Sequence, residues 1–247
     1  MIRFICNVCN SKCSAETAEA LDREIPSCPK CKSNVRFRWI VHALSTGLFG
    51  ESIPLDKFPR RKKIRGIGLS DEGRLAHVLT KRLDYRNTFY HQEPRFNIMD
   101  PPAGAQYDFI VASEVFEHVL APVQTAFDNL ARLLKPGGFA IFSTPWESEG
   151  ETLEHFPDLY DWQVAKLRSG YVLVNRTAAG TLQTFGNLVF HGGPGSTLEM
   201  RMFARDGLLA NCQAAGFTDV AIAEDYPEYG IVWVPWSRGM VLRKPLV

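Results

Sequence analysis

Four cysteines near the N-terminus have the spacing of a metal site. They form two Cys-x2-Cys pairs, Cys6 with Cys9 and Cys28 with Cys31, and 18 residues separate the pairs. Each pair can direct two thiolates at one ion, and together they provide the tetrahedral four-sulfur site typical of structural Zn2+. Because four protein ligands leave no position for a substrate, we expect a structural zinc ribbon. The ion would stabilise a segment too short to build a core of its own.

The remaining cysteines fit the same interpretation. Cys13 could replace one of the four ligands if the register differs, and Cys212 lies in a predicted helix where a buried core thiol is expected. Residues 1–10 lack the apolar run of a signal peptide, and no apolar stretch is long enough to cross a bilayer. We therefore predict a cytoplasmic protein with reduced cysteines and no membrane partner.

Three of the six histidines are candidates for acid–base chemistry. His118, His155 and His191 lie in segments expected at or above a cleft in the main domain. Histidine titrates close to neutral pH, so it suits the removal of a proton from a hydroxyl or amine. The alternative is that these side chains only shape a pocket, and that His118 makes a structural hydrogen bond where a helix begins.

Strand-like and helix-like segments alternate from about residue 63 onward. This alternation predicts an α/β fold in which helices cover both faces of a mostly parallel, doubly wound sheet. The predicted strands are residues 64–69, 87–91, 96–100, 107–113 and 139–144, and the predicted helices begin after Ser70-Asp71 and at Pro122.

The chain divides into three predicted parts: residues 1–50 (zinc ribbon and following helix), 51–62 (linker) and 63–247 (main domain). In the helix after the ribbon, Arg36 and Arg38 alternate with Phe37 and Trp39. This face could touch RNA, but we favour docking onto the main domain with the arginines in water. Residues 146–200 are too long for a simple connection, so we expect a cap that carries substrate recognition, with a hairpin over 171–185. A lid that only buries apolar surface is the alternative.

Three blocks carry a family resemblance. Residues 107–119 (YDFIVASEVFEHV) and 133–145 (LLKPGGFAIFSTP) are similar to the fourth and fifth strand regions of class I S-adenosylmethionine-dependent methyltransferases. Residues 201–209 and 214–220 resemble that family's last helix and sixth strand. The resemblance covers roughly residues 63–245. It implies a seven-stranded sheet with S-adenosylmethionine across the carboxyl ends of the first strands.

The resemblance also implies where the cofactor contacts this chain. The glycine-rich turn after the first strand is reduced to Gly66-Ile67-Gly68, and Arg65 and Gly66 stand in the region where the family usually has an acid. By position, the implied cofactor-binding residues are Gly66, Gly68, Ser70, Glu93, Asp100, Ser113 and Glu114.

Charge separates the functional alternatives. The whole chain has a net charge of +1, although its first 63 residues hold twelve Lys and Arg against six Asp and Glu. A near-neutral chain favours a methyltransferase whose partner is a small-molecule acceptor, methylated at O, N or C. One alternative is an RNA methyltransferase that reads nucleic acid with its zinc ribbon. Another is a non-catalytic binding protein with this fold. The oligomeric state is not indicated by the sequence.

Overall fold

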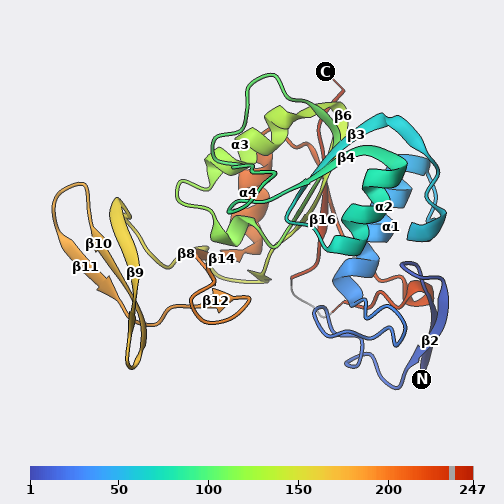
Figure 1. The fold of residues 1–247 in the computed structure, drawn as a ribbon, viewed down its shortest axis with the longest axis horizontal. Coiled ribbons are helices and arrows are strands. Elements are labelled where there is room, and N and C mark those ends of the chain that lie inside the picture. Colours follow the sequence, from blue (N-terminus) through green and yellow to red (C-terminus); the bar gives the residue numbers. More distant parts are fainter. Residues whose placement is uncertain (234–236, 247) are drawn as a thin grey trace.

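The computed structural model describes residues 1–233 and 237–246 and has a six-stranded central sheet (Figure 1). Neighbouring strands β3 to β6 run parallel, while β16 is antiparallel to both β6 and β15. The predicted α/β class is therefore confirmed, with six strands rather than seven in the described residues. Their order is β15 (Asp219–Ile222), β16 (Met240–Arg243), β6 (Leu134–Ser143), β5 (Tyr107–Ser113), β3 (Arg61–Leu69), β4 (Leu83–Thr88).

The prediction of a strand at residues 96–100 is wrong. The chain turns there because the Asn97 side chain accepts a hydrogen bond from the backbone N–H of Met99 at 3.0 Å. Ile98 is buried, and the Asn129 side chain donates to its carbonyl at 2.8 Å. With its backbone groups engaged locally, this segment does not extend the sheet.

Two helices cover each face of the sheet (Figure 1). On one face lie α1 (Val35–Phe49), capped by the Asn34 side chain, and α2 (Gly73–Arg82). On the other lie α3 (Gln124–Leu133) and α4 (Arg205–Ala214), where Cys212 is buried as expected. Helix α2 begins later than predicted, because Glu72 rather than Ser70 or Asp71 accepts from its first backbone N–H groups.

The N-terminal module, residues 1–34, packs directly on the main domain. Its hairpin consists of β1 (Ile2–Cys6) and β2 (Ser11–Ala15). Phe4 and Leu21 belong to the same apolar core as Trp39 and Phe109. The segment predicted as a linker takes part in this core, since η1 (Leu55–Lys57) and Phe58 bury two side chains completely. Residues 1–62 therefore share one core with the sheet.

The cap, residues 146–200, is built from short strands. It is anchored where β14 (Arg201–Ala204) pairs with β7 (Trp146–Glu147) and β8 (Leu153–Glu154). The predicted hairpin is present and is joined by a third strand, in a sheet that projects from the body (Figure 1). The outer strands are β9 (Asp161–Leu167), β10 (Gly170–Arg176) and β11 (Leu182–Phe185), followed by β12 (Phe190–His191) and β13 (Thr197–Leu198). Among the described helices, none has the length and apolar character needed to span a membrane.

Candidate active site

Polar side chains gather where the parallel strands end. Ser70 follows β3 and Glu114 follows β5, and both have positive φ angles, 64° and 56°. Non-glycine residues seldom adopt this conformation, and such strained positions are frequent at functional sites. The N–H of Glu114 donates to the Ser143 carbonyl of β6 at 2.8 Å. The ends of β3, β5 and β6 thus form one polar edge, which we call the carboxyl edge.

The two glycines of β3 permit close packing inside the domain. A Cβ atom at Gly66 would overlap the Phe109 ring, and one at Gly68 would overlap the Tyr85 hydroxyl and the Asp71 carboxylate. Gly66 thus packs inside the strand. Gly68 is also packed against protein atoms, and it lies two residues before Ser70 at the carboxyl edge.

Asp71 is a carboxyl edge residue that the sequence analysis treated only as part of a helix start. The Tyr85 hydroxyl donates a short hydrogen bond to its carboxylate, and the Asn87 side chain bonds to both backbone polar groups of Asp71, at 2.9 and 3.0 Å. Burial raises the pKa of Asp71 to about 7, although the Tyr85 hydroxyl acts to lower it. This carboxyl group therefore titrates near neutral pH.

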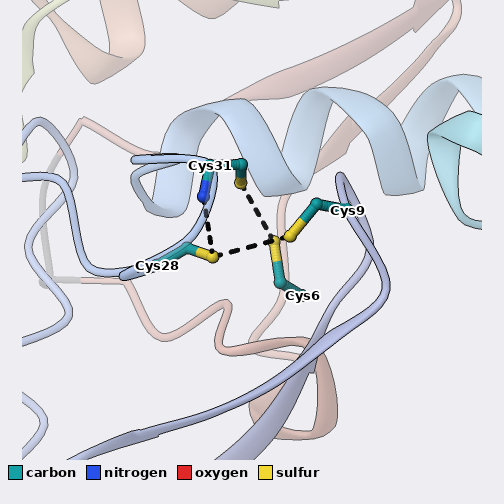
Figure 2. A group of neighbouring side chains, drawn as sticks. All are labelled: Cys6, Cys9, Cys28 and Cys31. Carbon is teal, nitrogen blue, oxygen red and sulfur yellow. Dashed lines mark hydrogen bonds between the residues drawn. The ribbon is translucent and has the colours of Figure 1, made fainter.

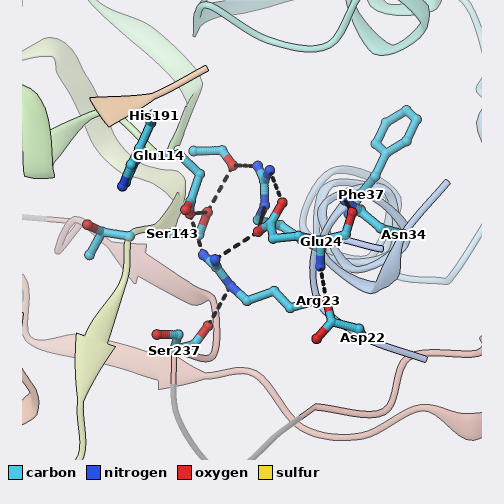
Figure 3. A network of polar contacts seen from close by, with 12 residues as sticks. Asp22, Arg23, Glu24, Asn34, Phe37, Glu114, Ser143, His191 and Ser237 are labelled. Carbon is cyan, nitrogen blue, oxygen red and sulfur yellow. Dashed lines mark hydrogen bonds and ion pairs between the residues drawn. The ribbon is translucent and has the colours of Figure 1, made fainter. Parts of the chain in front are cut away.

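An arginine from the N-terminal module reaches the carboxyl edge (Figure 3). Arg23 makes a short ion pair with Glu114 and also donates to the Ser237 carbonyl at 3.0 Å. Glu114 accepts a further hydrogen bond from the Ser143 hydroxyl at 2.8 Å. Burial alone would raise the pKa of Glu114, but Arg23 and Arg36 hold it below its ordinary value.

Arg36 joins the same network from the first turn of α1. Its Nη1 donates to the Ser113 hydroxyl at 2.6 Å, while Nε and Nη2 form a two-point contact with Glu24 at 2.8 and 2.7 Å. Arg38 is fully buried and donates to the Gly230 carbonyl at 2.7 Å. The predicted docking of α1 is confirmed, but the placement of these arginines in water is wrong, because carbonyl and carboxylate oxygens satisfy the guanidinium groups.

Glu93 and Asp100 lie in the segment after β4, and both are exposed. Glu93 accepts from the backbone N–H of Arg95 at 3.1 Å. Neither acid is hydrogen-bonded to Ser70, Ser113 or Glu114 in the described part of the chain. The structure brings Gly68, Ser70, Ser113 and Glu114 to the carboxyl edge, whereas Glu93 and Asp100 form no hydrogen bond or ion pair with these residues in the described part of the chain.

The three predicted histidines meet in one cluster with two glutamates, Glu117 and Glu199. His118 and Glu117 come from η2 (Phe116–His118), directly after β5, whereas His155, His191 and Glu199 come from the cap. The His118 and His191 rings lie 4.7 Å apart at their centroids, edge to face. The charge of Glu114 acts on the pKa of both Glu117 and His191, so this cluster adjoins the carboxyl edge. Figure 3 includes His191 among the residues drawn around this network.

The cluster has a distinct electrostatic character. Burial, reinforced by the charge of Glu114, raises the pKa of Glu117 to about 8. Burial lowers the pKa of His118, whereas the hydrogen bond to Glu199 raises that of His191. The sequence indicated the histidines by residue type and placed Glu117 beside His118 after the strand, but it gave no sign of Glu199, which is brought to the cluster by the folding of the cap.

The four predicted zinc ligands converge (Figure 2). The sulfur atoms of Cys6 and Cys31 are 3.6 Å apart, and those of Cys9 and Cys28 are 3.7 Å apart. A tetrahedral site with zinc–sulfur bonds of about 2.3 Å has sulfur–sulfur edges of about 3.8 Å. The donor set and spacing therefore fit Zn2+. Cys13 lies beside the group, 3.6 Å from Cys28.

The sequence matches the model of one protein family, described as a methyltransferase domain, over residues 44–189, which is more than half of the chain. The chain belongs to this family. The prediction of an S-adenosylmethionine-dependent methyltransferase is confirmed at this level. A search of the curated proteins finds no match.

Several solved structures are similar in overall fold. An amino pentose methyltransferase from Micromonospora echinaspora is 16% identical, with 73% of this chain and 83% of that chain covered and a TM-score of 0.43. A sugar N-methyltransferase from Streptoalloteichus sp. ATCC 53650 is 13% identical, with 84% and 86% covered and a TM-score of 0.45. A 1,6-didemethyltoxoflavin N1-methyltransferase from Burkholderia thailandensis is 16% identical, with 83% and 77% covered and a TM-score of 0.43. At these values the likenesses establish nothing about the acceptor of this chain.

Proposed function

We propose that this methyltransferase transfers the methyl group of S-adenosylmethionine to a small-molecule acceptor held between the carboxyl edge and the cap. The observation that carries the proposal is the contact of the cap with the turn after β5. The backbone N–H of Met200 donates to the Glu117 carbonyl at 2.7 Å, and His118 Nδ1 lies 2.8 Å from the Leu198 carbonyl. The cap thereby closes over the turn that follows the strand end.

The residues at the carboxyl edge fit the cofactor. Ser70, Ser113 and Glu114 supply hydroxyl and carboxylate groups at the strand ends, and the Gly68 backbone lies just before the turn that carries Ser70. When bound, the cofactor supplies an activated methyl group on a sulfonium. The protein must align the acceptor with that methyl group and exclude water. Glu93 and Asp100 remain predicted contacts to its ribose and adenine.

The burial of three arginines, Arg23 of the module and Arg36 and Arg38 of α1, favours a small molecule over RNA. Arg23, Arg36 and Arg38 are all engaged by oxygen atoms within the chain. They are therefore not presented as a basic surface to a phosphate backbone, and the net charge of +1 adds little attraction. Arg23 and Arg36 instead stabilise the carboxyl edge through Glu114 and Ser113.

The histidine cluster is the proposed place of the acceptor's reacting group. His118, His155 and His191 are the candidates for the residue that accepts its proton. The charge of Glu114 acts on Glu117 and His191 of the cluster, so an acceptor bound there would be close to the proposed cofactor site.

The cysteine group is the proposed structural zinc site, with Cys6, Cys9, Cys28 and Cys31 as ligands. Their sulfur spacing supports this assignment. Because the site requires reduced thiolates, a cytoplasmic location is part of the proposal.

Calorimetric titration with S-adenosylmethionine tests the cofactor site. Wild-type protein should bind with one site per chain, and Glu114→Gln should bind at least about 10-fold more weakly, because its charge on the polar edge is lost. Glu147→Gln, an exposed change in β7, is the matched control. No binding by the wild type would contradict the proposal. Transfer of labelled methyl groups into an RNA fraction, but not into small molecules, would instead favour the RNA alternative.

A further inference from the structure

Glu117, His118 and His191 of the cluster bring three possible metal-ligand atoms close together. Glu117 Oε1 is 3.7 Å from His118 Nε2 and 3.9 Å from His191 Nδ1. All three donor atoms lie within 4.8 Å of one another. These separations are too long for hydrogen bonds, so the three groups do not satisfy each other.

Glu117 needs a partner that the described residues do not provide. Its side chain is completely buried, and its Oε2 accepts a hydrogen bond from the Thr144 hydroxyl at 3.0 Å. Its Oε1 has no hydrogen-bond partner among the described residues. A buried, unpartnered carboxylate oxygen is unfavourable by several kcal/mol in an apolar setting. This oxygen is the one that faces the two imidazoles.

In each of the two histidines, one ring nitrogen contacts a residue outside the group of three, which determines the nitrogen that faces Glu117. His118 Nδ1 is 2.8 Å from the Leu198 carbonyl, which can only accept, so Nδ1 carries the proton and Nε2 keeps its lone pair. His191 Nε2 is 2.9 Å from Glu199, which leaves Nδ1 toward Glu117. The other Glu199 oxygen is 2.9 Å from His155 Nε2. Metal-binding histidines are held in this way, by a carbonyl or carboxylate on the opposite nitrogen.

We infer that Glu117, His118 and His191 bind one divalent transition-metal ion, with Thr144, Leu198 and Glu199 orienting the three ligands. Bonds of about 2.1 Å require donor atoms about 3.4 Å apart in a tetrahedral site, so small side-chain movements suffice. Two imidazoles and one carboxylate suit Zn2+, Fe2+ or Co2+ and leave open positions for water or a substrate oxygen.

This inference deepens the proposed function, since the ion would lie where the acceptor is proposed to bind. His118 and His191 would then hold the ion, and His155 would remain as the candidate proton acceptor. The metal-binding part itself does not depend on methyl transfer and is tested without the cofactor.

Cobalt substitution distinguishes this site from the cysteine group. Untagged full-length protein is stripped of metal and titrated with Co2+, and bound cobalt is followed by absorption. We expect one ion with the intense charge-transfer bands of thiolate ligation, lost in Cys28→Ser, and a second ion with only weak visible bands. The second ion should be lost in Glu117→Gln and His191→Gln, and bound about 10- to 100-fold more weakly by Glu199→Gln. His77→Gln, an exposed histidine on α2, should change neither.

Two results would overturn the inference. One is wild-type protein that binds no cobalt outside the thiolate site. The other is a second cobalt ion unaffected by Glu117→Gln and His191→Gln, in variants whose circular dichroism and melting temperature match the wild type. S-adenosylmethionine titration of the same samples separates the two proposals. Cofactor binding without the second cobalt refutes only the metal site, and the reverse refutes only the proposed cofactor site.

Discussion

Replacement of Asp71 by Asn should change how the stability of the protein depends on pH. Asp71 accepts a hydrogen bond from the Tyr85 hydroxyl, and an Asn side-chain oxygen can accept the same bond. The bonds with Asn87 use the backbone of residue 71, so they survive the substitution. The variant thus removes the titrating group with little change in packing.

The magnitude follows from the pKa of Asp71. It rises from an ordinary value of 3.8 to about 7 in the folded chain, because burial disfavours the charged form. Each pH unit between the two values is worth about 1.4 kcal/mol, which gives an upper limit of about 4 kcal/mol. Because the residue is partly exposed, solvent screening reduces this, and we expect about 2 kcal/mol.

The sign of the stability change depends on whether the folded or the unfolded chain releases the Asp71 proton at the lower pH. Below about pH 4 Asp71 is neutral in both states, so it does not affect the balance. Between pH 4 and 7 the unfolded chain releases the proton while the folded chain keeps it, and the wild type loses stability. The stability of Asp71→Asn relative to the wild type should therefore increase over this range and then level off.

Thermal unfolding of both proteins at a series of pH values from 4.5 to 8 measures the effect. We expect the melting temperature of the variant to gain about 4 to 8 °C on the wild type across this range. Asp161→Asn, an exposed change in β9, is the control and should give a constant difference. A constant difference for Asp71→Asn as well would show that burial of this carboxyl group does not oppose its ionisation.

Three further predictions test other parts of the site. Removal of the cysteine-bound metal by a chelator should lower the melting temperature of the whole chain in one transition, since the module and the sheet share a core; two separate transitions would contradict this. Arg38→Met should destabilise the protein by about 3 kcal/mol in urea unfolding, because it leaves the buried Gly230 carbonyl without its donor, and a loss below about 1 kcal/mol would argue against that role. His155→Ala should lower turnover about 100-fold with unchanged S-adenosylmethionine affinity, and turnover within a few fold of the wild type would exclude it as the base.

Elements with strong local signals could be predicted from the sequence. The strand at Tyr107–Ser113 has the bounds expected, and the cysteine spacing correctly indicated four converging sulfur atoms. The residues of the strand are consecutive in sequence, and the four cysteines repeat a short motif. The α/β class followed in the same way from the order of strands and helices.

Features that depend on a particular side chain or on distant contacts could not be predicted. A single Asn97 side chain converts an apolar segment into a turn, and no periodicity reveals that competition. The pairing of Arg23 with Glu114 joins residues 91 positions apart. The sequence showed basic residues near the N-terminus, but only the folded chain shows that Arg23, Arg36 and Arg38 among them face inward.

The turn after β5 explains why the site draws on three separate parts of the chain. Glu114 and Glu117 are three residues apart, yet they meet different partners: Glu114 pairs with Arg23 of the N-terminal module, whereas Glu117 faces His191 of the cap. Two carboxylates so close together repel each other, and one takes up a proton unless each has a cation or metal beside it. The module supplies that cation for Glu114, and the proposed ion would supply it for Glu117. The module is therefore part of the site rather than an appendage, since without its arginine the turn that carries both glutamates would hold uncompensated negative charge.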